Sequence, residues 1–138
     1  MADLAIIPES GKKASTYRKR KAQHPLSAFN DRLDADGWFS PDTYGRDFAS
    51  AGDFSAVYMF LVVDDWPDMR FHIAYVGMST RLERRWATHP TLRKIRDRHE
   101  WVKRLFKPTP KALLRTEERR YIQEYLPPWN IIGRVPGQ

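Results

Sequence analysis

Two adjacent carboxylates lie at the margin of an otherwise apolar helical stripe near the end of the chain. At about 100° per residue, Glu118 has Leu114 one turn before it and Ile122 one turn after it. A carboxylate at an apolar margin loses hydration unless a cation, a metal ion or a hydrogen-bond donor meets it. A salt bridge, for example to Arg85, is the commoner explanation, and a metal-binding carboxylate is the alternative. Periodicity does not choose between Glu117 and Glu118.

A row of basic side chains follows a predicted strand. Arg81, Arg85 and His89 are spaced four residues apart, so a helix would align them in one row. The row is either a solvated basic face or an arrangement that directs Arg85 and His89 toward a ligand. Arg84 falls outside the row and is expected to be solvated.

Three further polar side chains are ordinary when each is taken alone. Tyr58 and Tyr75 lie in predicted strands, where a tyrosine usually packs with its hydroxyl at a wet edge. Asn130 follows a Pro-Pro-Trp run, where it could simply cap a turn. None of the three indicates a function without the others.

Composition limits the chemistry that is available. The chain has 138 residues, enough for about one domain, and its net charge of +7 with a pI near 9.9 favours a polyanionic partner such as nucleic acid. It contains no cysteine, which excludes disulfides, thiolate zinc sites and cysteine nucleophiles. Its four histidines do not have the spacing of a zinc motif.

The N-terminal part of the chain divides into two segments. Residues 1–25 look like a flexible basic arm, which is either a solvated tail or an arm that lies along phosphates. Its cations are Lys12, Lys13, Arg18, Lys19, Arg20 and Lys21. Residues 26–54 are expected to be an extension that packs on the core through Phe29, Trp38, Phe39, Tyr44 and Phe48. Neither a signal peptide nor a membrane span is recognisable, so a cytoplasmic protein without membrane contact is expected.

Residues 55–138 carry the predicted core domain. Residues 56–64 and 69–77 favour two strands of a hairpin joined by an acidic loop, with Gly77 ending the second strand. Alternation in the second strand predicts one face with Phe71, Ile73 and Tyr75 and another with His72, Ala74 and Val76.

The rest of the domain is predicted to be helical apart from one strand. Thr80 and Glu83 match a capping box, which predicts a helix from Arg81 to about His89, with Leu82 and Trp86 buried. Residues 91–106 favour a short helix followed by a third strand at 99–106. Thr109-Pro110 predicts the start of the last helix, whose apolar face is Leu113, Leu114, Tyr121, Ile122 and Tyr125, and Pro127-Pro128 its end.

Taken in order, these residues resemble the GIY-YIG nuclease family. The matching segments are Ala56-Val57-Tyr58, Tyr75-Val76-Gly77, Leu82-x-x-Arg85-Trp86-x-x-His89, Glu118-x-x-Tyr121-Ile122 and Pro127-Pro128-Trp129-Asn130. They span residues 55–131, a little over half of the chain. Each motif is degenerate, but all five occur in the family's order.

The resemblance implies a fold, an activity and a site. It implies an α+β fold with a three-stranded antiparallel sheet flanked by helices, and hydrolysis of DNA phosphodiester bonds with one Mg²⁺ or Mn²⁺ ion. It implies that Glu118 binds the metal and that Arg85 neutralises the scissile phosphate. The phenol of Tyr58 would activate or position the attacking water, with Tyr75 in support.

Further implied roles concern proton transfer, geometry and the DNA backbone. His89 matches a histidine that some members use with tyrosine in proton transfer, and Asn130 would hold the site from behind. Arg81 would track the DNA backbone, and Gly77 would let backbone and phosphate approach closely. The family's members act in bacterial or phage-infected cells, in homing, restriction or repair.

The chain departs from the family at two points. Ala56 replaces the glycine of the first motif, and the tyrosines are 75 − 58 = 17 residues apart, which is long for the family. The gap fits a hairpin whose acidic loop, residues 64–68, points away from DNA. The sequence shows no second DNA-binding domain, so targeting would need the arm or a protein partner. A non-catalytic nucleic-acid-binding module and a basic structural protein are the alternative functions.

Overall fold

The computed structural model describes residues 24–42 and 53–132. The packing divides the chain into a unit that ends at Asp31 and a unit that begins at Arg32. Helix α1, Pro25–Ala35, crosses this boundary. All remaining elements belong to the second unit. The basic arm of the sequence prediction lies outside the described residues.

An antiparallel three-stranded sheet forms the centre of the second unit. Strand β2, Ala56–Asp64, lies between β3, Arg70–Ser79, and β4, Trp101–Pro108. Every residue of β2 from Ala56 to Val63 is buried, which explains its uninterrupted apolar sequence, because both faces of a central strand are covered. The predicted α+β class with three antiparallel strands is confirmed. The third strand begins and ends two residues later than predicted.

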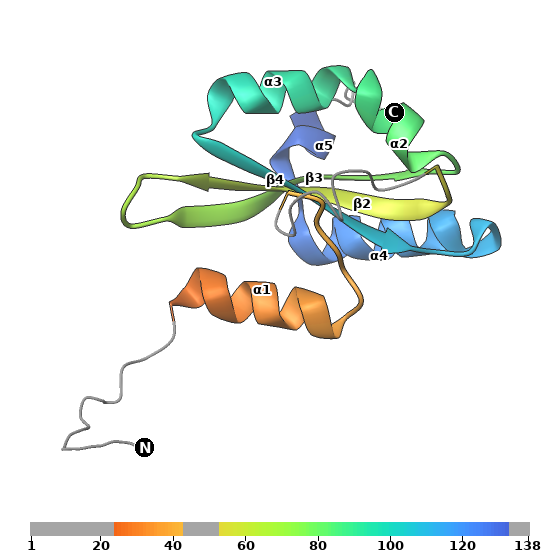
Figure 1. Cartoon of the computed structure of the whole chain (residues 1–138), viewed down its shortest axis with the longest axis horizontal. Coiled ribbons are helices and arrows are strands. Elements are labelled where there is room, and N and C mark those ends of the chain that lie inside the picture. Colours follow the sequence, from red (N-terminus) through yellow and green to blue (C-terminus); the bar gives the residue numbers. More distant parts are fainter. Residues whose placement is uncertain (1–23, 43–52, 133–138) are drawn as a thin grey trace, which may run out of the picture. The chain divides into compact units, whose positions relative to one another are not determined.

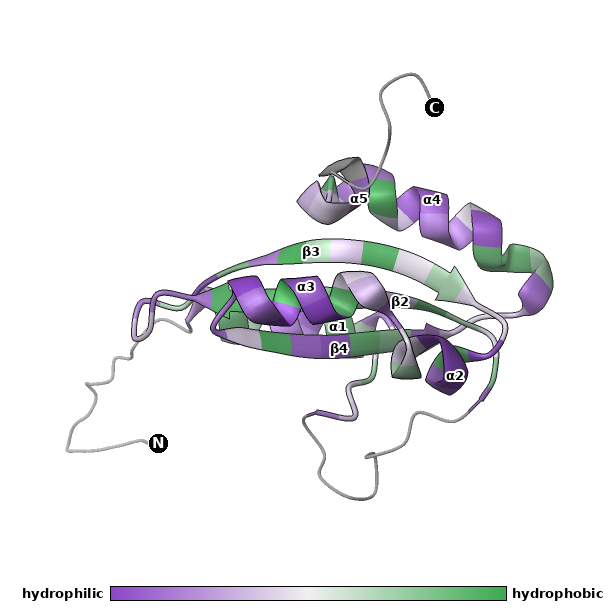
Figure 2. Ribbon diagram, turned by 90° about the horizontal axis from the view of Figure 1, so that it is seen from above, coloured by the Kyte–Doolittle hydropathy of each residue, from purple (hydrophilic) through white to green (hydrophobic). Residues whose placement is uncertain are grey.

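Helices flank the sheet on both sides. Helices α2, Leu82–Ala87, and α3, Pro90–Arg98, lie over one face, whereas α4, Leu114–Tyr125, lies on the other side (Figure 1). Helix α5, Pro128–Ile132, also contacts β3. In Figure 2, α3 shows hydrophobic bands between hydrophilic ones, as expected for a helix with one buried side. Leu82 of α2 and Ile95 of α3 are fully buried against the sheet. They belong to one core cluster with Tyr58 and Phe60.

A β-bulge in β3 corrects the predicted strand faces. Phe60 pairs with Tyr75, but the next residue, Leu61, pairs with Ile73, which leaves Ala74 as an extra residue. Ala74 and Tyr75 consequently belong to the same core cluster, with Tyr58 and Phe60. The prediction that Tyr75 shares a face with Phe71 and Ile73 is therefore wrong. Strict alternation failed because a bulge reverses the side-chain direction of everything beyond it.

The start of α2 differs from the predicted capping box. Strand β3 continues past Gly77 to Ser79, and α2 begins at Leu82 with no cap from the side chain of its first flanking residue, Arg81. Asp53 acts in place of Thr80: its Oδ1 accepts a hydrogen bond from the Arg84 backbone N–H at 3.3 Å, and its Oδ2 from Arg81 Nε at 3.2 Å. A carboxylate at this end satisfies an N–H that the helix leaves unpaired.

His89 lies outside the helix in which the sequence placed it. Helix α2 ends at Ala87, and His89 is the residue immediately before α3, where its side chain accepts a hydrogen bond from the Leu92 N–H at 3.2 Å. His89 therefore caps α3 and does not continue the row of Arg81 and Arg85 along α2. The proline at position 90 explains the break, because the residue before a proline avoids helical backbone angles.

The last helix also begins later than predicted. Thr109 Oγ1 donates to the Lys107 carbonyl at 2.8 Å and caps no helix; a 3₁₀ turn, η2 (Lys111–Leu113), precedes α4. Leu113 consequently remains 49% exposed, whereas Leu114 and Tyr121 are buried as predicted. The end of α4 at Tyr125 is in the predicted place.

The residues before β2 pack on the far edge of the sheet. Phe39 forms two backbone hydrogen bonds of 2.8 Å with Phe106 of β4, and Trp38 packs edge-on against Tyr121 at 5.0 Å between ring centroids. Phe39 thereby covers an otherwise open edge of β4. Tyr44 and Phe48 lie outside the described residues. No helix in the described part of the chain is long and apolar enough to cross a membrane.

Replacing Leu126 with glycine should stabilise the fold. Leu126 follows α4 with φ 46° and ψ 57°, a left-handed conformation, and is 67% exposed. This conformation costs a residue with a Cβ about 1–2 kcal/mol, partly offset for glycine by its freer unfolded state. Leu126→Gly should raise the free energy of unfolding in urea by about 0.5–1 kcal/mol. Leu126→Ala keeps the Cβ and should not be stabilised; equal effects of both variants would contradict this account.

Candidate functional site

A buried tyrosine–histidine pair forms the centre of the candidate site. Tyr58 Oη and His89 Nε2 are 2.8 Å apart, and the two side chains are only 1% and 3% exposed. Tyr58 comes from β2, whereas His89 comes from the junction of α2 and α3. The sheet and the helical layer therefore meet at this hydrogen bond.

The second hydrogen bond of His89 determines where its proton lies. Nδ1 accepts from the Leu92 N–H, so a neutral ring carries its proton on Nε2. Burial and the positive charge of Arg85 lower the pKa of His89 to about 4 from its ordinary value of 6.5, which keeps the ring neutral at pH 7. The Nε2–H of His89 therefore donates to the oxygen of Tyr58. In this tautomer, His89 has no free nitrogen to accept a proton from the phenol.

The β-bulge brings a second phenol to the same place. The Tyr75 ring stacks on Phe60 at 5.7 Å between centroids, and it lies 6.2 Å from the Tyr58 ring and 5.3 Å from the His89 ring. Without the extra residue Ala74, Tyr75 would point to the other face of the sheet. Bulges next to functional sites often serve to redirect a side chain in this way.

One cation and one carboxylate act on both phenols. Burial raises the pKa of Tyr58 and of Tyr75; the positive charge of Arg85 opposes this rise, and the negative charge of Glu118 adds to it. The two phenols also influence each other, since Tyr75 raises the pKa of Tyr58. The structure thus brings together five of the six predicted catalytic residues, from β2, β3, α2, the α2–α3 junction and α4.

The tertiary structure distinguishes the two adjacent glutamates. Glu117 Oε1 forms an ion pair of 3.0 Å with Arg120 Nη1, one turn later on the exposed surface of α4. Glu118 is the carboxylate whose charge reaches Tyr58 and Tyr75. Helix periodicity placed both residues at the margin of the apolar stripe, and only the position of α4 along β3 separates their surroundings.

Gly77 makes room for the Tyr58 ring. A Cβ at position 77 would lie 2.5 Å from Tyr58 Cζ and 2.6 Å from Tyr58 Oη, both far inside van der Waals contact. The two residues are direct cross-strand partners. The predicted reason for this glycine was close approach of a phosphate; the structure gives a different one, because the space beside its Cα is filled by the phenol.

Asn130 holds the edge strand beside Tyr75. Its side-chain amide accepts from the Val76 N–H and donates to the Val76 carbonyl, with both distances 2.8 Å. Because β3 is an edge strand, these backbone groups point away from β2 and need another partner. Asn130 does not join the cluster of phenols, and it fixes the backbone between Tyr75 and Gly77.

Arg81 is exposed and pairs with Asp53 at 3.2 Å, so part of its charge is already met within the chain. The arm residues predicted to contact DNA lie outside the described ranges.

The sequence did not indicate that two polar groups, the Asp53 carboxylate and the Trp86 indole N–H, would lie near the candidate site. Trp86 was recognised only as core, and its NH has no hydrogen-bond partner in the described part of the chain.

The candidate site fits a metal ion that is bound by a single carboxylate. Among residues 24–42 and 53–132, no group of three or more histidine, aspartate or glutamate side chains is placed to bind an ion together. Mg²⁺ commonly binds proteins through one or two carboxylates and completes its shell with water and substrate phosphate. Glu118, half-buried beside the phenols, fits that kind of site.

Comparison with known proteins identifies no relative: no protein-family model, no curated protein and no solved structure matches the chain.

The neutral His89 should make folding stability depend on pH. Because its pKa is about 4 when folded and 6.5 in the ordinary state, the unfolded chain binds the proton preferentially. The stabilisation is complete above pH 6.5 and is lost as the pH falls toward 4. Between pH 7 and 4.5, wild type should lose about 2–3 kcal/mol more unfolding free energy than His89→Asn.

The asparagine variant is a suitable reference because its amide oxygen can still accept from the Leu92 N–H, while its side chain does not titrate. Urea unfolding followed by circular dichroism measures both proteins. Parallel pH profiles would show that His89 is not held neutral in the folded protein.

Gly77→Ala should destabilise the protein through Tyr58. The added methyl would overlap the phenol, and overpacking of a buried site costs about 1–3 kcal/mol. In a Tyr58→Leu background the ring is gone, so the same alanine should cost clearly less. The double-mutant cycle, measured by urea unfolding, yields the coupling energy. An equal loss in both backgrounds would mean that Gly77 is needed for another reason.

Proposed function

We propose that the chain is a metal-dependent endonuclease of the GIY-YIG type that hydrolyses DNA phosphodiester bonds. The observation that carries the proposal is the convergence of Arg85 and Glu118 on the same two phenols. These residues are 33 positions apart (118 − 85) and lie on different helices, which flank the sheet on different sides (Figure 1). A packing role alone gives no reason for a cation, an acid and two tyrosines to meet at one point.

The order of the elements also supports the proposal. A hairpin, a helical segment, a third strand and a terminal helix follow one another as the resemblance implies. The asparagine after Pro127-Pro128-Trp129 meets the second strand of that hairpin, as a residue supporting the site from behind would. The net charge of +7 suits a polyanionic substrate.

In this proposal, Arg85 binds the scissile phosphate. Its guanidinium is exposed on α2 and lies against the buried phenols, so a phosphate can approach from the solvent side. A planar fork of donors contacts two phosphate oxygens at once and stabilises the negative charge that grows on them in the transition state. Removing such a donor typically lowers a rate 10²–10³-fold.

The phenols begin the reaction protonated. Their raised pKa values exclude a resting phenolate at pH 7, so Tyr58 and Tyr75 first serve as hydrogen-bond donors to water or phosphate oxygen. A phenol becomes an effective base only when nearby positive charge lowers its pKa. The Nε2–H of His89 already points at the Tyr58 oxygen, where it would stabilise negative charge during proton transfer.

Glu118 would bind the divalent metal. When bound, the ion would neutralise charge on the phosphate and its leaving oxygen. The carboxylate would be complemented by water and by the substrate, since the described cluster offers few acids.

Cleavage of supercoiled plasmid tests the proposal. Purified protein should cut the plasmid with Mg²⁺ and stop when excess chelator is added. Arg85→Ala and Glu118→Ala should each reduce the cutting rate at least 100-fold while retaining binding to the uncut plasmid. The rates are read from gel densities over time.

Two neighbouring residues provide matched controls. Arg84→Ala removes an equal charge one position earlier, and Glu117→Ala removes an acid whose partner is Arg120. Both should cut at close to the wild-type rate. If the plasmid binds but is never cut, the alternative of a non-catalytic nucleic-acid-binding module is correct. Cutting by Arg85→Ala or Glu118→Ala at the wild-type rate would overturn the assigned site.

A further inference from the structure

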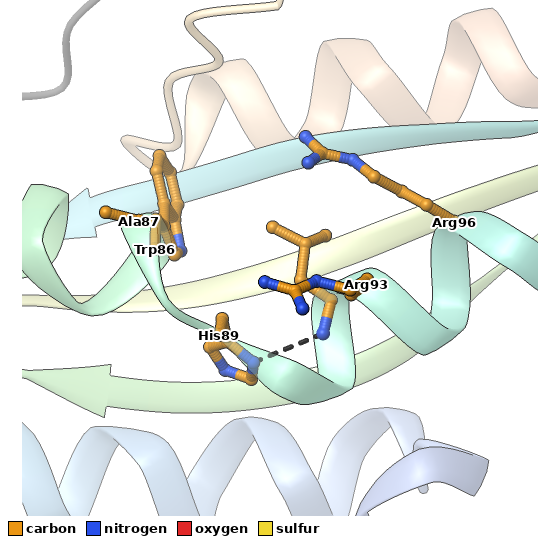
Figure 3. A pocket seen from close by; sticks show the side chains of 6 residues that line it. Trp86, Ala87, His89, Arg93 and Arg96 are labelled. Carbon is orange, nitrogen blue, oxygen red and sulfur yellow. Dashed lines mark hydrogen bonds between the residues drawn. The ribbon is translucent and has the colours of Figure 1, made fainter.

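A polar pocket lies beside the candidate site, between the end of α2 and the first turns of α3 (Figure 3). Its volume is about 100 Å³, several times what a single water needs. The lining residues are Trp86, Ala87, His89, Leu92, Arg93 and Arg96. None of the roles assigned above uses the arginines of this pocket.

An unpartnered buried donor points into the pocket. Trp86 is 6% exposed, and its Nε1–H is buried without a hydrogen-bond partner in the described part of the chain. In Figure 3 the indole nitrogen faces the space bounded by Arg93 and His89. A buried donor left unsatisfied costs about 1–3 kcal/mol, so such a group calls for a ligand that accepts a hydrogen bond.

The charge of the pocket selects the kind of acceptor. The guanidinium groups of Arg93 and Arg96 form no hydrogen bond and no ion pair with a described residue. Arg104, which does not line the pocket, provides the contrast: its guanidinium lies over the Trp86 ring, 5.0 Å from the centroid, and forms an ion pair of 2.8 Å with Asp42.

Asp42 also attracts Arg96, but its two carboxylate oxygens are already occupied by the backbone and side chain of Arg104. A water molecule could satisfy the indole, but it would bring no negative charge to the guanidinium groups of Arg93 and Arg96. An anion with several oxygens in a tetrahedral arrangement satisfies the indole and both guanidinium groups together.

We propose that Trp86, Arg93 and Arg96 form a phosphate-binding pocket distinct from the Arg85 position. His89 separates the two places: its Nε2 holds Tyr58, and its ring lines the pocket. A phosphate in the pocket would therefore lie next to the reacting group. This assignment rests on the proposed nuclease function, under which the bound group would be a DNA backbone phosphate that flanks the scissile one. Free inorganic phosphate shares the same chemistry.

Inorganic phosphate is the first probe. In ¹H–¹⁵N spectra at constant ionic strength, the Trp86 indole peak, identified by its loss in Trp86→Phe, should shift saturably with phosphate. Arg93→Gln and Arg96→Gln should each weaken the apparent affinity roughly tenfold or more, the effect expected for a charge-assisted hydrogen bond. Lys94→Gln, an equal loss of charge on α3 outside the pocket, should leave it within about twofold.

A peak that does not move with phosphate would overturn the pocket. A shift that survives unchanged in both arginine variants would overturn the assigned residues. Because Trp86→Phe keeps an aromatic ring in the core, its circular dichroism spectrum should match wild type.

A short DNA duplex distinguishes the source of the phosphate. With Glu118→Gln protein and chelator present, the duplex should shift the same indole peak. In Arg93→Gln, the plot of log affinity against log salt concentration should become less steep, by the amount expected for the loss of about one phosphate contact. A duplex that binds without moving the peak would overturn the backbone assignment and leave free phosphate as the ligand.

The plasmid assay keeps the two proposals separable. If wild type neither binds nor cuts DNA, the nuclease proposal fails, and the titration with inorganic phosphate still decides the pocket. If wild type cuts and the indole peak is insensitive to phosphate and duplex, the pocket proposal fails and the nuclease proposal stands.

Discussion

The hydrogen bond between Tyr58 and His89 is the contact on which the site depends. A phenol that is 1% exposed needs a partner for its hydroxyl, and His89 Nε2 is that partner at 2.8 Å. The same imidazole caps α3 through Nδ1, so one side chain links the central strand to the start of a helix. The phenol can occupy this position only because Gly77 has no Cβ. Strand pairing, helix capping and the orientation of the Tyr58 phenol are thus coupled through one ring.

The electrostatic arrangement follows from the same burial. Tyr58, Tyr75 and His89 all have pKa values shifted toward their neutral forms, because the surrounding core disfavours charge on any of them. Formal charge is kept at the margin, on Arg85 and Glu118. A neutral, hydrogen-bonded interior with charges at its rim would bind an anionic substrate from the solvent side without a permanently buried ion. The same principle applies to the adjacent pocket, where the guanidinium groups of Arg93 and Arg96 surround a buried indole donor.

Both edges of the small sheet are closed by segments outside it. Phe39 pairs with β4 through its backbone, and Asn130 satisfies the Val76 backbone on β3 through its side-chain amide. An exposed edge would invite pairing with another chain, and a three-stranded sheet has two edges next to one central strand. The closure at Val76 has a second consequence, because it fixes the backbone between Tyr75 and Gly77. Protection of the edge and support of the site are therefore achieved by one residue.

The sequence by itself determined the elements and the set of chemical groups. An apolar run and an alternating pattern identified the two hairpin strands. The third strand was favoured in a segment whose pattern also fits a helix, and local signals placed the helices to within a few residues. The types and order of Tyr58, Tyr75, Arg85, His89, Glu118 and Asn130 suggested a site before any coordinates. Only the tertiary structure decided how those groups face one another. Tyr75 lies on the same face as Tyr58 because of a bulge at Ala74, and strict alternation of side chains along the strand cannot predict such a bulge. Asp53 caps α2, and Glu118 is distinguished from Glu117, through contacts between segments that are distant in sequence. Local patterns report how each segment folds, whereas directions and partners depend on packing between segments, which no single segment encodes.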